Sequence, residues 1–140
     1  MLSPDGSTVY VGNSYPSVFH AINTTDGSSL WTYTAAAAVV GVPALSGDGA
    51  TIYFGTEALI LVAVNTADGT ELWAKPNSGN GAFGSPTLSV DGLKIYIGSK
   101  DSKLYCYTTA GVQQWTYTTG DEIKSSPTLN SDGSTLYIGS

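Results

Sequence analysis

The sequence is poor in basic residues, in charge of any sign, in cysteine and in long apolar runs. Only five of its 140 residues are Lys or Arg, against eleven Asp or Glu, so the net charge is −6 at pH 7. Phosphate contacts need clustered basic side chains, so we expect no nucleic-acid partner and no anionic membrane surface. The longest apolar candidate, residues 35–45, is broken by Gly41 and Pro43. It falls short of the roughly 18 residues that a membrane span needs, so we expect no membrane insertion.

Cysteine is almost absent, because Cys106 is the only one. No intrachain disulfide can form. No basic and then apolar leader precedes the first repeat, so we expect no signal peptide in this chain. Sparse charge with plentiful Gly, Ser, Thr and Tyr is typical of extracellular or periplasmic β proteins, and this is the location we predict. A disordered chain would carry more charge and fewer aromatics, so residues 1–140 are expected to form one domain.

Three series of residues recur with one period near 42. Asp-Gly pairs follow one another at intervals of 43, 43 and 41 residues, and the tryptophans are 42 residues apart. A period of this length indicates a repeat architecture. The pairs begin at Asp5, Asp48, Asp91 and Asp132, the tryptophans are Trp31, Trp73 and Trp115, and a third series is residues 42–46, 85–89 and 126–130.

One unit reads as four short strands, here called A to D, with no competing helical period. Tight turns at Asp-Gly separate strand A from strand B and, in most copies, strand C from strand D. Strands B and C are apolar on both faces, so both faces must be covered. Sheets stacked face to face around an axis achieve this, and four strands in 40 to 45 residues predict an all-β fold of antiparallel β-propeller blades. In the first unit, strands B, C and D are residues 8–12, 17–22 and 29–34. Strand A is absent there, and residues 85–89 are an example of it from a later unit.

The order of the units predicts an incomplete ring. The chain reads B-C-D, A-B-C-D, A-B-C-D and A-B, which is about three and a quarter blades. The blade pieces are residues 1–36, 37–80, 81–123 and 124–140. Because propellers close with about four to eight blades, two interpretations remain. The chain is part of a longer propeller, or two copies close a ring of about six blades, with strand A of one completing B-C-D of the other.

Residues 21–31 and 63–73 carry a more specific signal. They resemble the tryptophan-docking motif of the quinoprotein (PQQ-like) propeller family, whose pattern is roughly A-x-D-x-x-T-G-K-x-x-W. The resemblance implies that each indole spans a junction between blades, with a partner for its N–H, and that the turn glycine takes a positive φ. The matching residues are Ala21, Gly27 and Trp31 and then Ala63, Gly69 and Trp73, with Asn23, Asn65, Asp26 and Asp68 departing from the pattern. A third copy, residues 106–115, is one residue shorter and keeps Gly111 and Trp115.

Candidates for chemistry are few, and we assign no catalytic, cofactor-binding or metal-binding residue. His20 is the only histidine and is expected to be packed or at an edge, with a ligand role as the alternative. Cys106 is expected to be a buried inert thiol. The Asp-Gly aspartates are expected to accept hydrogen bonds from nearby backbone N–H groups. Residues 65–71 leave calcium open as an alternative, although they lack the ligand spacing of an EF-hand.

Function is expected on the loops that enter strand A, because these loops differ most between blades. They are residues 35–42, 76–85 and 119–126, and the residues to test first are Phe83, Asp121, Glu122 and Lys124, with ordinary solvated loop residues as the alternative. We expect a non-catalytic binding or scaffold propeller for an unknown protein or small ligand, or a fragment of such a propeller, with no cofactor. The alternative is part of a pyrroloquinoline-quinone-dependent dehydrogenase. The family resemblance would then imply a calcium ion, a catalytic Asp and often a vicinal disulfide, and this sequence has no Cys-Cys pair.

Overall fold

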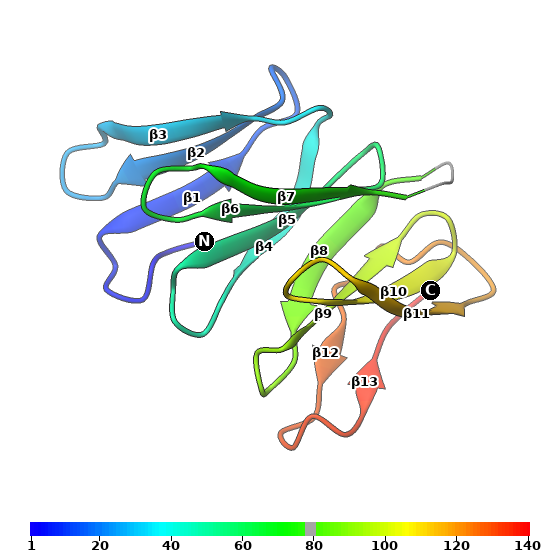
Figure 1. Cartoon of the computed structure of the whole chain (residues 1–140). Helices are drawn as coiled ribbons and strands as arrows, with labels where there is room; N and C mark the ends of the chain where they lie inside the picture. The colour runs from blue at the N-terminus through cyan, green and yellow to red at the C-terminus, as the bar shows by residue number, and fades with distance from the viewer. Residues whose placement is uncertain (78–80) are drawn as a thin grey trace.

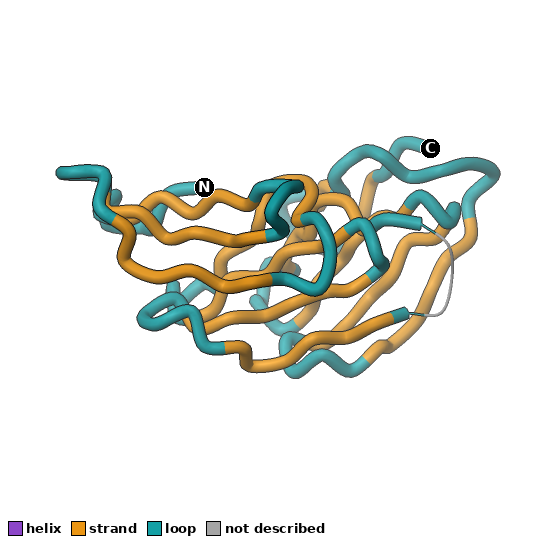
Figure 2. The backbone as a smooth tube through the Cα atoms, turned by 90° about the horizontal axis from the view of Figure 1, so that it is seen from above, coloured by secondary structure: helices purple, strands orange, loops and turns teal. Residues whose placement is uncertain are grey.

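The computed structural model describes residues 1–77 and 81–140 and contains thirteen strands and no helix among them (Figures 1 and 2). The first sheet holds β1 (Thr8–Gly12), β2 (Val18–Asn23) and β3 (Ser29–Thr34). The second holds β4 (Val39–Leu45), β5 (Thr51–Thr56), β6 (Ile60–Asn65) and β7 (Glu71–Pro76). The third holds β8 (Phe83–Leu88), β9 (Lys94–Ser99), β10 (Lys103–Thr108) and β11 (Gln113–Thr118), and β12 (Thr128–Leu129) pairs with β13 (Leu136–Tyr137).

These sheets confirm the predicted fold class. Every pairing is antiparallel between strands adjacent in sequence, giving sheets of three, four, four and two strands. Figure 1 shows the sheets following one another, with the first sheet and the β12–β13 pair at opposite ends of the arrangement. The blades are partial at both ends and the ring is not closed.

The innermost strand of each middle blade begins earlier than predicted. β4 begins at Val39, which pairs with Thr56, and β8 begins at Phe83, which pairs with Ser99. Sequence reasoning missed these starts because the ladder is irregular before Ala44 and before Pro86. Proline lacks the N–H that a regular ladder needs and is tolerated at bulges, so the apolar residues before the irregularity looked like loop.

The first sheet is also more complete than predicted. Leu2 pairs with Val9, the Ser3 N–H donates to the Thr8 carbonyl at 2.8 Å, and the terminal amine of Met1 donates to the Tyr10 carbonyl at 2.9 Å. In the next blade Leu45 pairs with Ile52 in the corresponding place. Residues 1–3 therefore occupy the last part of the strand A position beside β1.

The core is divided among the three gaps between sheets. Successive residues of the central strands enter opposite gaps, because side chains alternate across a strand. Thus Val62 and Val64 of β6 face the first sheet, whereas Leu61 and Ala63 face the third. The third gap is the smallest, with the buried residues Tyr96, Leu104, Cys106 and Ile123 and the partly buried Leu129, Leu136 and Ile138.

Candidate binding groove

Two of the three tryptophans join neighbouring sheets in the same way. Trp31 of β3 donates its indole N–H to the Thr66 carbonyl at 2.8 Å, in the turn after β6. Trp73 of β7 donates to the Thr109 carbonyl at 3.1 Å, in the turn after β10. Each indole also lies against the glycine of that turn. Because both glycines have no side chain, the ring and the backbone can approach closely.

The turn glycines are required by both conformation and space. Gly69 has φ of 73°, and a Cβ atom there would lie 2.5 Å from Trp31 Cε3. Gly111 has φ of 78°, and its Cβ would lie 2.7 Å from Lys75 Cε and 2.9 Å from Trp73 Cδ2. Left-handed backbone favours glycine, and no real Cβ tolerates these distances without movement of its neighbours.

Trp115 of β11 stands in the equivalent position but lacks these contacts. Its ring packs on Tyr96 at a centroid distance of 5.9 Å, as Trp31 packs on Tyr10 and Trp73 on Tyr53. Within residues 1–77 and 81–140, however, its indole N–H meets no acceptor. The residue remains 39% exposed. Trp115 therefore shows an indole of this series without a covering turn.

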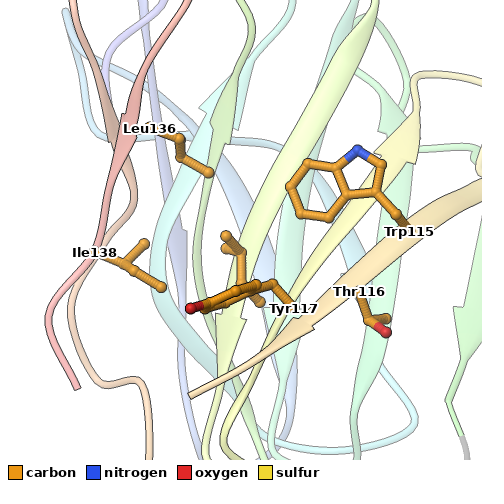
Figure 3. Close-up of a pocket in the computed structure, with 6 residues that line it drawn as sticks. Trp115, Thr116, Tyr117, Leu136 and Ile138 are labelled. Carbon is orange, nitrogen blue, oxygen red and sulfur yellow. The ribbon is translucent and has the colours of Figure 1, made fainter.

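The uncovered indole forms one wall of an apolar groove of about 520 Å³. Figure 3 shows Trp115 and Tyr117 of β11 facing Leu136 and Ile138 of the C-terminal segment. Leu104, which is buried, also lines the groove, and Tyr117 is exposed at 61%. Contiguous exposed apolar surface of this kind marks binding surfaces in soluble proteins. The groove is a continuation of the third gap of the core.

Phe83, a candidate from the loop 76–85, lies in a strand and not in a loop. Phe83 is the first residue of β8 and is fully buried, with its ring edge-on to Tyr105 at 5.2 Å. Its neighbours Ser78, Gly79 and Asn80 of the candidate loop 76–85 lie outside the described residues. The loop 35–42 is likewise shorter than predicted, because β4 begins at Val39.

The other loop candidates are only partly brought together. Lys124 lines a small hollow of about 150 Å³ above buried Phe83, and Lys100 lines it too. Asp121 and Glu122 do not line it. The Asp121 carboxylate accepts from the Glu122 N–H at 2.7 Å, and Glu122 forms a 3.1 Å ion pair with Lys124 that is largely exposed. Exposed pairs of this kind contribute little stability. The sequence could have indicated Lys100 as a further candidate at this end. It follows strand B, and B–C turns reach the same end of an antiparallel blade as the loops that enter strand A.

The Asp-Gly aspartates act in their turns, as predicted. The Asp48 carboxylate accepts from the Ala50 N–H at 3.0 Å and from the Ser46 hydroxyl at 2.6 Å. Asp5 is bonded in the same way by Ser3 and Ser7, and these bonds lower the pKa of its carboxyl to about 2. Hydrogen bonds to the charged form favour ionisation. The same cause lowers the pKa of the equivalent turn carboxyls, which are Asp26, Asp48, Asp68, Asp91 and Asp132.

These six carboxylates share one end of the sheets. A–B turns and C–D turns reach the same end of an antiparallel blade, because successive strands reverse direction. Together these six carboxylates carry a charge of −6, which is also the net charge of the whole chain. The other five acidic residues are balanced in number by the five lysines. The negative charge of the chain is therefore concentrated at the turn end.

The single histidine and cysteine take the places expected of them. Cys106 is fully buried on β10, and burial raises the pKa of its thiol. His20 is partly buried on β2, opposite Val11 and Thr32 in the neighbouring strands. In the described part of the chain, no three His, Cys, Asp or Glu side chains gather in a way that could hold a metal ion. The same residues contain no helix long and apolar enough to cross a membrane.

Comparison with known proteins identifies the repeat. A search of curated proteins gives no match to this chain. The family model described as outer membrane protein assembly factor BamB matches residues 2–139. This range includes all four sheets and each of the tryptophan-to-turn contacts. The chain belongs to this family of PQQ-like β-propeller repeats.

Proposed function

We propose that the chain is a non-catalytic binding scaffold of β-propeller blades that recognises protein through its uncovered sheet surface. The observation that carries this proposal is the groove between β11 and β13, where Trp115 and Tyr117 are exposed beside Leu136 and Ile138. Aromatic residues on a preformed apolar surface are typical of protein interfaces. The name of the matching family, an assembly factor for outer membrane proteins, agrees with a scaffold role.

The charged residues of the turns have a structural role that agrees with a scaffold. Six carboxylates are ionised and bonded within their own turns, where their hydrogen bonds hold the hairpins. A general base or nucleophile is instead tuned toward the operating pH by its surroundings. The pKa shift of these carboxyls is downward, away from neutral pH. We also propose a periplasmic or outer-membrane-associated location, which the name of the matching family, an outer membrane protein assembly factor, supports.

The proposal is tested by titrating the chain with pyrroloquinoline quinone in the presence and absence of Ca²⁺. We expect no saturable heat and no dye-linked alcohol oxidation. Tight binding at one quinone per chain would overturn the proposal and favour the dehydrogenase alternative.

The groove itself is tested with the fluorescent apolar probe ANS at low protein concentration. We expect the parent chain to enhance ANS fluorescence and Tyr117→Ser to reduce the enhancement. Leu93→Gln is the matched control, because Leu93 is exposed at 62% but does not line the groove. Equal enhancement by both variants and the parent would show that the groove is not the binding surface.

A further inference from the structure

A small hollow lies where the innermost strands of three consecutive sheets begin. Its volume is about 150 Å³, and all the residues that line it fall between positions 40 and 124. Its floor is apolar, because Phe83 and Ile123 are buried there. Lys100 and Lys124 also line it, and both are exposed. We call this feature the lysine hollow.

The backbone that carries the two lysines is fixed to buried strand ends. The Lys100 N–H donates to the Ala82 carbonyl at 3.1 Å. The N–H of Ile123, which precedes Lys124, donates to the carbonyl of the fully buried Ser99 at 3.0 Å. Both side chains therefore start from fixed positions, which lowers the entropy that is lost when a ligand binds.

Lys100 supplies a positive charge that no ion pair neutralises. Among the described residues, the ion pair with an acidic side chain is that of Lys124 with Glu122, at 3.1 Å. The three residues outside the described ranges carry no acidic group. The Lys124–Glu122 pair is largely exposed and contributes little stability. An incoming carboxylate can therefore share or replace Glu122 as the partner of Lys124.

Ser85 adds a hydrogen-bond donor to the same hollow. Its Oγ accepts from the Val42 N–H at 2.9 Å, and this bond fixes the position of the oxygen. Within residues 1–77 and 81–140 the hydroxyl proton meets no acceptor, so it can be donated to a ligand. A Cβ atom at Gly41 would lie 2.7 Å from Ser85 Oγ. The absence of a side chain at Gly41 therefore leaves this hydroxyl accessible.

Charge is balanced at the end of the blades where the hollow lies. This end contains four lysines and four acidic residues, in contrast to the six carboxylates of the turn end. The lysines are Lys75, Lys100, Lys103 and Lys124, and the acidic residues are Glu57, Asp101, Asp121 and Glu122. An anionic ligand therefore meets no opposing net charge as it approaches the hollow.

We propose that the lysine hollow binds a carboxylate that carries a small apolar group. Lys100 and Lys124 balance the charge of the carboxylate, and the Ser85 hydroxyl donates to one of its oxygens. The apolar group covers Phe83 and Ile123 and is removed from water. The hollow is smaller than the roughly 300 Å³ at which sites for drug-sized ligands begin. It therefore suits a terminal group about as large as one side chain.

The surroundings of the hollow favour a singly charged ligand over phosphate. The carboxylates of Asp101 and Glu122 lie next to the two lysines in sequence or in space, and they would repel a doubly charged group. Phosphate also has no apolar part to cover the floor. The C-terminal residue of a peptide and a free short-chain carboxylic acid share the required chemistry. The site goes beyond the scaffold proposal, because it shares no lining residue with the groove at Trp115.

The test titrates the isotope-labelled chain with acetyl-leucine and follows the backbone amide signals by NMR. We expect saturable shifts at Gly41, Gly84 and Lys100, and none with acetyl-leucine amide, which lacks the charge. Isovalerate is the second carboxylate. Tighter binding of acetyl-leucine assigns the site to peptide C-termini, and tighter binding of isovalerate assigns it to free acids. No saturable shift with either carboxylate would overturn the proposal, as would equal affinity for the amide.

Point variants then locate the site. Lys100→Gln should weaken the binding of acetyl-leucine at least about fivefold, because a hydrogen bond to a charged group is lost. Lys103→Gln is the matched control, since Lys103 lies at the same end but does not line the hollow, and it should bind like the parent. Glu122→Gln should tighten binding about twofold by freeing Lys124. Equal weakening by both lysine variants would overturn the proposal, and unchanged affinity in Glu122→Gln would contradict the role of Lys124.

Discussion

The junction between the second and third sheets and the junction between the third sheet and β12–β13 contain the same tryptophan in two states. At the first, Trp73 donates to the Thr109 carbonyl and lies against Gly111. At the second, Trp115 retains only its aromatic neighbour Tyr96 and is 39% exposed. The comparison shows that the turn of the following blade, and not the strand that carries the indole, completes the contact.

The largest expected effect that tests this comparison is that of Trp73→Ala. Truncation removes a half-buried indole, its hydrogen bond and its contact with Gly111. We expect a loss of about 3 kcal/mol in the free energy of unfolding, at the low end for aromatic truncations. Urea denaturation measures it, and a variant as stable as the parent would refute a structural role for the junction.

Gly69→Ala tests the turn side of a complete junction. The new Cβ would lie 2.5 Å from Trp31 Cε3 at a positive φ, so both strain and a steric clash are expected. We predict a loss of about 2 kcal/mol, of which about 1 kcal/mol comes from the backbone conformation. Gly27→Ala is the control at low protein concentration, because its Cβ meets open space and only the backbone cost remains. Equal losses would show that the indole does not restrict the turn.

Trp115→Ala should cost the single chain about 1 kcal/mol, well below Trp73→Ala, because the indole has neither its hydrogen bond nor its turn. The measurement uses urea denaturation at a concentration where the chain is monomeric. A loss as large as that of Trp73→Ala would remove the contrast between the two junctions.

The smallest expected effect is a pH dependence of stability that arises from the aspartates of the hairpin turns, which occur on both sides of the comparison. The six turn carboxyls have a lower pKa in the folded chain than in the unfolded one, with Asp5 near 2. A lowered folded pKa stabilises the fold above the unfolded pKa of about 3.9 and loses that contribution as pH falls through the folded value. We expect the thermal midpoint to be steady above about pH 5 and to fall between about pH 4 and pH 2. Asp48→Asn should reduce the slope of that fall, and an unchanged slope would contradict the role of the turns.

The repeat made most of the fold predictable from sequence. The period near 42, the Asp-Gly turns and the two-faced apolar strands predicted an all-β propeller segment, and the structure confirms the thirteen strands. β1 and β3 have the predicted bounds, because turn residues define them on both sides. β4 and β8 do not, since irregular pairing near Pro43 and Pro86 conceals their starts.

The candidate site was less predictable, because it depends on which neighbouring turn packs against a residue and not on the residue itself. Phe83 was chosen from a variable loop, but its burial follows from pairing with Ser99, which no local pattern reveals. The groove at Trp115 could not be found from Trp115 itself, since Trp31, which is covered by a turn, is followed by the same residues, Thr-Tyr-Thr. It could have been inferred by asking which turn follows each tryptophan one repeat later, because that turn supplies the carbonyl and the glycine.

The concentration of six carboxylates at the turn end also affects how copies can approach one another. Two molecules that approached through their turn ends would bring like charges together. The resulting repulsion weakens when the charges are further apart than the Debye length, about 10 Å in 0.1 M salt. The turns that hold each hairpin thus also act against association of two molecules through their turn ends.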